Sequence, residues 1–111
     1  MRTAVYPGSF DPITMGHVDV LRRALGVFDR VVVAVLANPR KAPVSEVEGR
    51  ASAIREAVAE ALAELAGRID VLVFDGLTVD ACRSVAARHV VRGLRAVSDF
   101  EAELQMAYMN H

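Results

Sequence analysis

The chain has 111 residues and a mass of 12.0 kDa, which is the size of one domain. Hydrophobic residues make up 53% and charged residues 24%, a balance that excludes a disordered chain. The net charge of −1 predicts no polymeric nucleic acid partner, and the longest apolar run, residues 31–37, is too short to cross a membrane. With no signal segment at its start, and with Cys82 as its only cysteine, the chain is expected to be one cytoplasmic domain over residues 1–111.

The first third of the chain predicts a strand, a helix and a second strand. Residues 3–6 are β-prone, and Pro7-Gly8 is expected to end that strand. Apolar side chains then recur at helical spacing from Val18 to Phe28. Residues 31–36 form a continuous β-branched run, which is typical of a strand buried on both faces.

The rest of the chain repeats this alternation. An amphipathic helix is predicted from Val47 to Leu65, with Gly67 as its C-terminal cap. Further along, the pattern predicts a strand at 69–74, a helix at 79–88, a short strand at 89–92 and a helix from Val97 to the end.

Alternating strands and helices indicate an α/β fold, namely a Rossmann-like parallel sheet with helices on both faces. In such sheets, ligands bind beyond the carboxyl ends of the strands. The loops expected to hold the functional site are therefore residues 7–17, 38–46, 75–78 and 92–99.

The first of these loops combines features of a phosphate site. Gly8 permits close approach of a ligand to the backbone, and Ser9 offers a hydroxyl. Thr14 can cap the following helix, and Gly16-His17 lie where helix N–H groups and the dipole favour an anion. On spacing alone, a solvent-facing role for His17 is as well supported as a functional one.

A second cluster follows the last predicted strand. Arg92 and Arg95 flank Gly93 and could clamp a phosphate. Asp99 and Glu103 recur on one helical stripe that continues to Asn110. Spacing alone favours the simpler alternative, a solvated acidic face paired with surface arginines.

Both clusters resemble a known family. Residues 14–17 (Thr-Met-Gly-His), within the stretch 8–17, are similar to the signature of the nucleotidyltransferase superfamily. Residues 92–103 (Arg-Gly-Leu-Arg, then Asp-Phe-Glu and Glu) resemble the bacterial phosphopantetheine adenylyltransferases, and the resemblance spans essentially the whole chain. It implies adenylyl transfer from ATP to 4′-phosphopantetheine, giving dephospho-coenzyme A and pyrophosphate in coenzyme A biosynthesis.

The resemblance also implies roles for single residues. His17 and Lys41, the only lysine, would stabilise the transferring phosphate, with Mg²⁺ held by ATP and no metal site on the protein. The residues expected to bind phosphopantetheine are Ser9, Lys41, Leu77, Thr78, Arg92 and Asn110. The residues expected to bind ATP are Gly8, Ser9, Phe10, His17, Gly93, Leu94, Arg95 and Glu103.

The sequence departs from this family at two places. The chain lacks the family's later Ser-rich segment, so we expect a C-terminally truncated domain, and residues 44–49 are unusual, with Gly49 weakening a helix start. Two alternatives stay open: a nucleotidyltransferase with nicotinate mononucleotide or glycerol phosphate as acceptor, and a non-catalytic module that binds nucleotide or coenzyme A. The resemblance further implies a homo-oligomer, a hexamer in the family, and coenzyme A as a possible feedback ligand.

Overall fold

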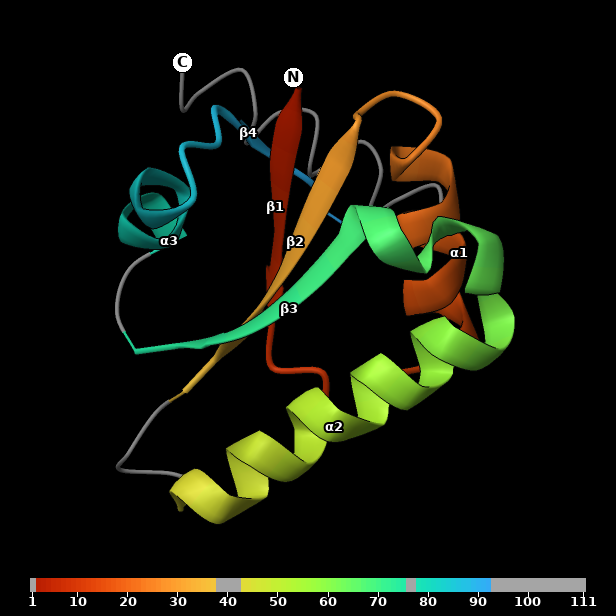
Figure 1. The fold of residues 1–111 in the computed structure, drawn as a ribbon. Helices are drawn as coiled ribbons and strands as arrows, with labels where there is room; N and C mark the ends of the chain where they lie inside the picture. Colours follow the sequence, from red (N-terminus) through yellow and green to blue (C-terminus); the bar gives the residue numbers. More distant parts are fainter. Residues whose placement is uncertain (1, 38–42, 76–77, 93–111) are drawn as a thin grey trace, which may run out of the picture.

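A computed structural model of the chain describes residues 2–37, 43–75 and 78–92. Four parallel strands form one sheet in the order β3-β2-β1-β4 (Figure 1). This arrangement confirms the predicted Rossmann-like parallel sheet. The strands are β1 (Thr3–Gly8), β2 (Arg30–Leu36), β3 (Ile69–Phe74) and β4 (His89–Val90).

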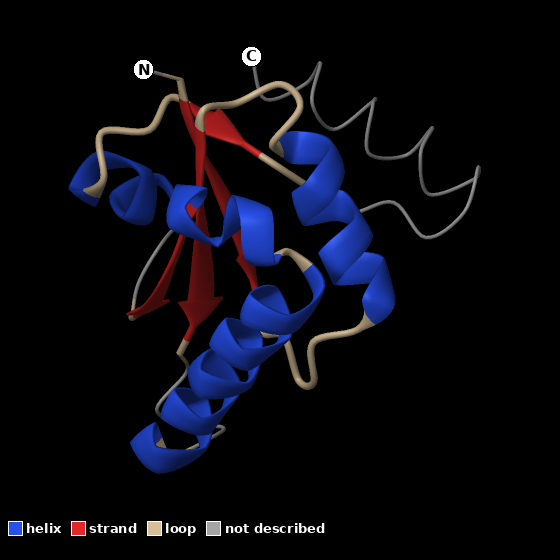
Figure 2. Ribbon diagram, turned by 45° about the vertical axis from the view of Figure 1, so that its right-hand side comes forward, coloured by secondary structure: helices blue, strands red, loops and turns tan. Residues whose placement is uncertain are grey.

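Helices cover both faces of this sheet, as the sequence predicts. α1 (Met15–Ala24) and α2 (Val44–Ala61) pack on one face, and α3 (Thr78–Ser84) packs on the other (Figures 1 and 2). A short 3₁₀ helix, η1 (Ala63–Arg68), joins α2 to β3. In the described part of the chain, no helix is both long enough and apolar enough to cross a membrane.

The two faces of β2 explain its unbroken β-branched run. Successive side chains of a strand point to opposite faces. Val31, Val33 and Val35 join the core under α1 and α2, whereas Val32 and Ala34 join the core under α3. All five are at most 3% exposed, so the prediction of a strand buried on both faces is confirmed.

The first strand is longer than predicted, because Pro7 and Gly8 continue it rather than end it. They pair with Ala34 and Val35 of β2. The carbonyl of Val5 accepts a hydrogen bond from Val91 on the β4 side, and backbone groups two residues apart point the same way. The missing N–H of Pro7 therefore faces the side on which β4 has already ended, at Val90.

The end of the second helix was also predicted wrongly. α2 ends at Ala61, and Gly67 lies inside η1 instead of capping the helix. Leu62, at φ −128°, turns the chain out of the α-helix, and its fully buried side chain holds that turn against the core. The turn thus depends on tertiary packing, which a search for a terminal glycine cannot detect.

The third helix and fourth strand are shorter than predicted. α3 ends at Ser84, because Ala86 adopts a left-handed φ of 58° and the N–H of Ala87 donates to the carbonyl of Cys82. Glycine usually occupies such a position, so an alanine there is no recognisable signal for the end of a helix. Cys82 is buried in α3. The helix predicted from Val97 lies outside the described residues.

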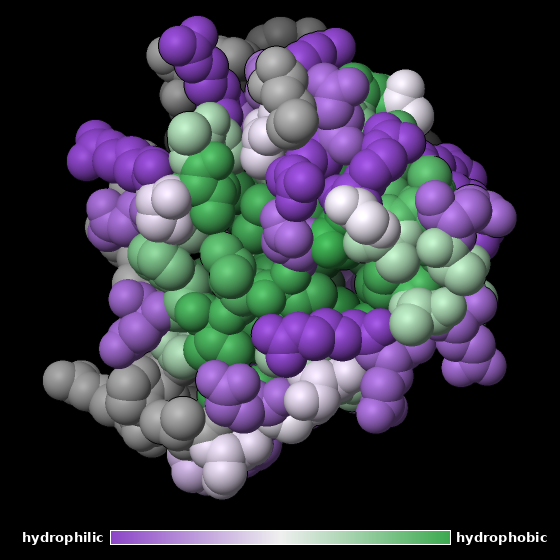
Figure 3. Space-filling model, in the orientation of Figure 1, coloured by the Kyte–Doolittle hydropathy of each residue, from purple (hydrophilic) through white to green (hydrophobic). Residues whose placement is uncertain are grey.

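One face of the molecule is apolar near the edge strand β3. Figure 3 shows hydrophobic side chains gathered there between more polar borders. Leu72 is 39% exposed, and Phe74 and Val85 are half-buried. A hollow of about 630 Å³ runs along this strand and is lined partly by Leu72 and Val85.

Candidate functional site

The predicted site lies at the carboxyl end of β1, where the loop to α1 borders a cleft. In this sheet β1 lies between β2 and β4: the chain proceeds from β1 outward to β3 with α1 and α2 on one face, and returns through α3 on the other face to β4 beside β1. Such a switch point leaves a crevice in which ligands bind. The cleft has a volume of about 710 Å³ and is lined by Tyr6, Pro7, Gly8, Ser9, Phe10, Asp11, Pro12, Thr14, Gly16, His17 and Val20.

The floor of the cleft is built around the ring of Phe10. This residue adopts φ 47°, a left-handed conformation that costs a non-glycine residue about 1–2 kcal/mol. Its ring is only 3% exposed and contacts the rings of Tyr6 and His17 edge-on, at centroid distances of 5.2 and 4.9 Å. A Cβ at Gly8 would lie 3.1 Å from Cε2 of this ring, so glycine allows the close approach.

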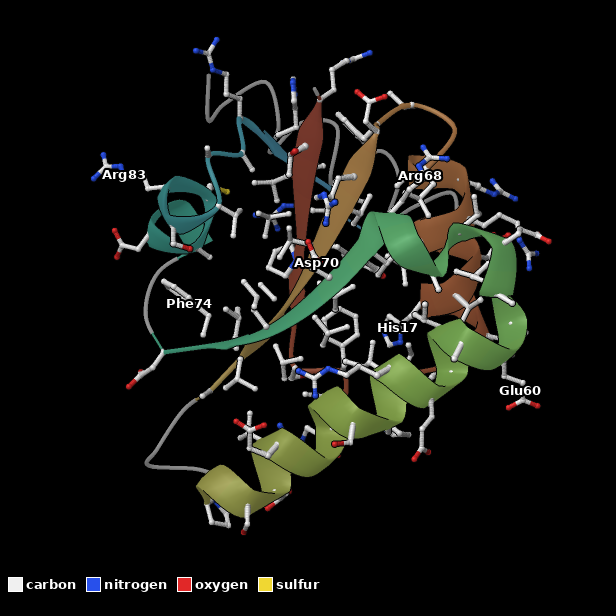
Figure 4. All side chains as sticks on the ribbon, viewed as in Figure 1. His17, Glu60, Arg68, Asp70, Phe74 and Arg83 are labelled. Carbon is white, nitrogen blue, oxygen red and sulfur yellow. The ribbon has the colours of Figure 1, made fainter. Side chains whose placement is uncertain are left out.

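His17 is held by the start of α1. The Thr14 N–H donates to His17 Nδ1 at 2.9 Å, and the His17 N–H donates to Thr14 Oγ1 at 3.4 Å. Together they form a capping box, in which the imidazole takes the place of the usual Glu or Gln side chain. Because Nδ1 accepts a hydrogen bond, the ring proton lies on Nε2, which can donate to a ligand oxygen. Figure 4 shows His17 near the loop that joins β1 to α1.

The same helix end favours an anion. The first N–H groups of an α-helix have no acceptor within the helix, and here Met15 and Gly16 supply two of them. The first turn of α1 contains no acidic residue, so the positive end of the helix dipole is not neutralised there. N–H groups, dipole and imidazole therefore suit a phosphate at this end of the cleft.

A salt bridge that the sequence did not reveal ties the loop to α2. Arg50 Nη2 lies 3.1 Å from Asp11 Oδ2 and 2.9 Å from Glu46 Oε1. The Arg50 side chain is only 14% exposed. Asp11 and Arg50 are far apart in the sequence, so no local spacing could have paired them.

Some of the predicted site residues lie within the described part of the chain, and others lie outside it. Gly8, Ser9, Phe10 and His17 lie together at the cleft, with Ser9 exposed and the Phe10 side chain buried beneath it. Arg92 is exposed and follows β4 by two residues, beside the carboxyl end of β1. Lys41, Leu77, Gly93, Leu94, Arg95, Asp99, Glu103 and Asn110 lie outside the described residues, as does the side chain of Thr78 at the start of α3.

Within the described ranges, no three His, Cys, Asp or Glu side chains come together in a way that could hold a metal ion. Away from the cleft, burial raises the pKa of the Cys82 thiol. None of the described residues that line the hollow along β3 is a predicted site residue. The cleft at the start of α1 is therefore the better candidate for the functional site.

Comparison with protein families agrees with this placement. The model of the family described as cytidylyltransferase-like matches residues 5–111, which include the whole cleft loop, β1 from Val5 onward and the other three strands. The chain belongs to the cytidylyltransferase-like family. Its parallel sheet and the helices on both faces form an α/β nucleotidyltransferase-like fold.

Curated relatives narrow the resemblance further. The chain is 56% identical over 107 residues to a phosphopantetheine adenylyltransferase of Gloeobacter violaceus, covering 96% of this chain and 63% of that protein. It is 54% identical over 110 residues to a protein of the same name from Rhizobium leguminosarum bv. trifolii, covering 99% and 67%. The phosphopantetheine adenylyltransferase of Lachnoclostridium phytofermentans is 45% identical over 111 residues, covering 100% and 65%. The chain thus spans about two thirds of the length of these relatives, and the resemblance predicted from the two motifs is confirmed.

Proposed function

We propose that the protein transfers an adenylyl group from ATP to 4′-phosphopantetheine, giving dephospho-coenzyme A and pyrophosphate in coenzyme A biosynthesis. One observation carries the proposal: His17, whose Nδ1 accepts a hydrogen bond from the Thr14 N–H, lies at the positive end of α1 and lines the cleft at the switch point of the sheet. Relatives named for this activity, between 45% and 56% identical, support it.

In the proposed reaction, a phosphate oxygen of 4′-phosphopantetheine attacks the α-phosphorus of ATP. The new P–O bond forms as the bond between the α-phosphorus and the β-bridging oxygen breaks, and that oxygen leaves with pyrophosphate. The attacking oxygen is already ionised, so no general base is required. The protein contributes by orienting both substrates and by stabilising negative charge on the α-phosphate.

The cleft residues divide this work. His17 donates from Nε2 to an α-phosphate oxygen, and the N–H groups at the start of α1 add the field of the helix end. Gly8 and Phe10 provide the backbone against which ATP lies, and Ser9 contacts both substrates. Lys41 assists His17 and holds the acceptor phosphate, and Arg92 binds the phosphopantetheine side.

The remaining assignments follow the family. Leu77, Thr78 and Asn110 border the pantetheine arm, and Gly93, Leu94, Arg95 and Glu103 line the ATP site. Mg²⁺ enters as part of the ATP substrate, bound to its phosphate oxygens. We further propose a cytoplasmic enzyme that self-associates, up to a hexamer, and that takes coenzyme A as a feedback ligand. The exposed apolar face near Leu72 and Phe74 supports self-association.

The test is pyrophosphate release measured against a panel of acceptors. ATP with Mg²⁺ is combined with 4′-phosphopantetheine, with nicotinate mononucleotide, or with glycerol phosphate, and CTP replaces ATP in a parallel series. The proposal predicts turnover with ATP and 4′-phosphopantetheine and at least about 100-fold lower kcat/KM with the other pairs. Preference for another acceptor would assign a different nucleotidyltransferase, and binding of coenzyme A without turnover would assign a non-catalytic module.

A further inference from the structure

Arg50 is a charged side chain held largely out of solvent on α2. Its Nη2 contacts one carboxylate from its own helix, Glu46, and one from the cleft loop, Asp11. Its Nε is inaccessible and has no hydrogen-bond partner among the described residues. A guanidinium N–H that is shielded from solvent and lacks a hydrogen-bond partner is costly, so the position of Arg50 calls for a compensating role.

The contact with Glu46 does not supply that role. Pairs four residues apart on an exposed helix surface contribute only about 0.3–0.5 kcal/mol, and the Glu46 side chain is half exposed. The contact with Asp11 differs, because it joins α2 to the loop between β1 and α1. In the described part of the chain, it is the ion pair that links this loop to another element.

The residue before Asp11 has a strained backbone conformation. Phe10 holds φ 47°, and such conformations persist only where the surroundings fix them. Its ring is packed against His17 at 4.9 Å, and the following carboxylate is tied to Arg50. Contacts on both sides of the peptide therefore hold the Phe10 backbone, and through its ring they set the position of the imidazole.

We propose that Arg50 is a positioning residue, which acts through Asp11 and Phe10 to hold the His17 ring in its productive orientation. The proposal rests on the proposed function for the role of His17, but the geometry it describes exists without substrate. Removing Arg50 releases the Asp11 anchor, so the loop can relax the left-handed Phe10 and let the imidazole turn. A misplacement of about 1 Å can cost about 100-fold in rate.

The test replaces Arg50 by Met, which keeps the aliphatic stem and removes the charge. Arg55→Met is the matched control, because Arg55 lies on the same helix but donates to the Val71 carbonyl of β3 instead of the loop. We expect Arg50→Met to lower kcat about 10- to 100-fold per folded molecule with KM for ATP within about threefold, and Arg55→Met to change kcat less than about twofold. Arg50→Lys should recover part of the loss, since it restores the charge.

A double-mutant cycle with Asp11→Asn tests the pair itself. If the salt bridge acts as a unit, the double variant loses no more kcat than the worse single variant. Multiplying losses would overturn the proposal, because the two side chains would then act independently.

A spectroscopic measurement separates this proposal from the proposed function. In ¹⁵N-labelled protein without substrate, the imidazole of His17 should show the Nε2–H tautomer, and Arg50→Met should shift it towards a mixture while Arg55→Met leaves it unchanged. If the unmodified chain has no turnover, the proposed function fails and this spectrum alone decides the role of Arg50. An unchanged His17 spectrum in Arg50→Met overturns the proposal, whether or not kcat falls.

Discussion

α1 and α2 both follow a strand at the carboxyl edge of the sheet and pack on the same core, yet their ends are fixed in different ways. α1 is short, and polar contacts fix both its ends: the capping box of Thr14 and His17 at its start, and the guanidinium of Arg68 beyond its last turn. α2 is longer and begins at Pro43 with no side-chain cap. It is held by an apolar stripe at Val47, Ala51, Ile54 and Val58, which Leu62 continues just beyond the helix.

The difference shows where precision is needed. A buried stripe holds a helix against the sheet but tolerates small shifts along it, whereas caps fix the end of a helix and the side chain that closes the cap. The proposed phosphate site lies at the capped end of α1. Through Arg50, α2 contributes support for the loop in front of that end.

The largest expected effect is at the capped end. His17→Ala should lower kcat about 10²- to 10³-fold, the usual cost of losing one donor to a developing oxyanion. His89→Ala is the matched control, since His89 lies in β4 against Phe28 and away from the cleft. Equal turnover by the two variants would remove His17 from the proposed chemistry.

The other end of α1 gives the next largest effect. Arg68 donates to the carbonyls of Leu25, Phe28 and Asp29 at 2.7, 2.8 and 2.8 Å. Arg68→Met should lower the free energy of unfolding by about 2–3 kcal/mol, measured by urea denaturation, because it removes charge-assisted hydrogen bonds to three carbonyls. Figure 4 shows Arg83 on the opposite side of the molecule, on α3, where Arg83→Met should change stability by less than about 0.5 kcal/mol. Similar losses in both variants would contradict this account of the α1 end.

The cap itself has a smaller effect. Thr14→Ala removes the acceptor for the His17 N–H and should cost about 1 kcal/mol of unfolding free energy, while Thr14→Ser should retain most of it. Thermal and urea unfolding of the three proteins measure the difference. If Ser and Ala destabilise equally, the hydroxyl is not the stabilising group.

A substitution in the uncapped helix α2 is expected to stabilise the protein. Gly49 lies within α2 and is exposed, and nothing lies within 4 Å of the position its Cβ would take. Gly49→Ala should therefore raise the free energy of unfolding by about 0.5–1 kcal/mol. Turnover should stay unchanged, and a fall in stability would show that α2 depends on this glycine.

The smallest effect belongs to α3, on the other face of the sheet. Burial raises the pKa of the Cys82 thiol, so the folded protein disfavours the thiolate. This contribution to stability is fully present below the ordinary thiol pKa and is lost as the pH rises through the raised value. The urea midpoint should fall more between pH 7 and pH 10.5 in the unmodified protein than in Cys82→Ala. Equal falls would mean that Cys82 does not titrate differently on folding.

The sequence predicted the parts of this comparison that local patterns determine. Residue type and spacing predicted three of them: the β-branched strand β2, the limits of β3, and the helix start at Thr14 and His17. What was missed depends on contacts between distant residues. Examples are the buried turn at Leu62 and the salt bridge between Asp11 and Arg50.

The site was partly predictable for the same reason. A histidine at a helix start after a glycine turn is compatible with phosphate binding, but spacing alone supports a solvent-facing role equally well. Only the family resemblance favoured the functional role of His17. Phe10 packs against the imidazole only because its backbone is left-handed. That conformation is rare for a non-glycine residue, and no sequence pattern predicts it.

The most direct test of the account is the identity and amount of product made from ATP, Mg²⁺ and 4′-phosphopantetheine. Mass spectrometry would quantify dephospho-coenzyme A alongside enzymatic detection of pyrophosphate, for the unmodified chain and for His17→Ala. We predict the two products in a one-to-one ratio, with both rates falling together in His17→Ala. Pyrophosphate released with AMP in place of dephospho-coenzyme A, or turnover that does not depend on His17, would contradict the account.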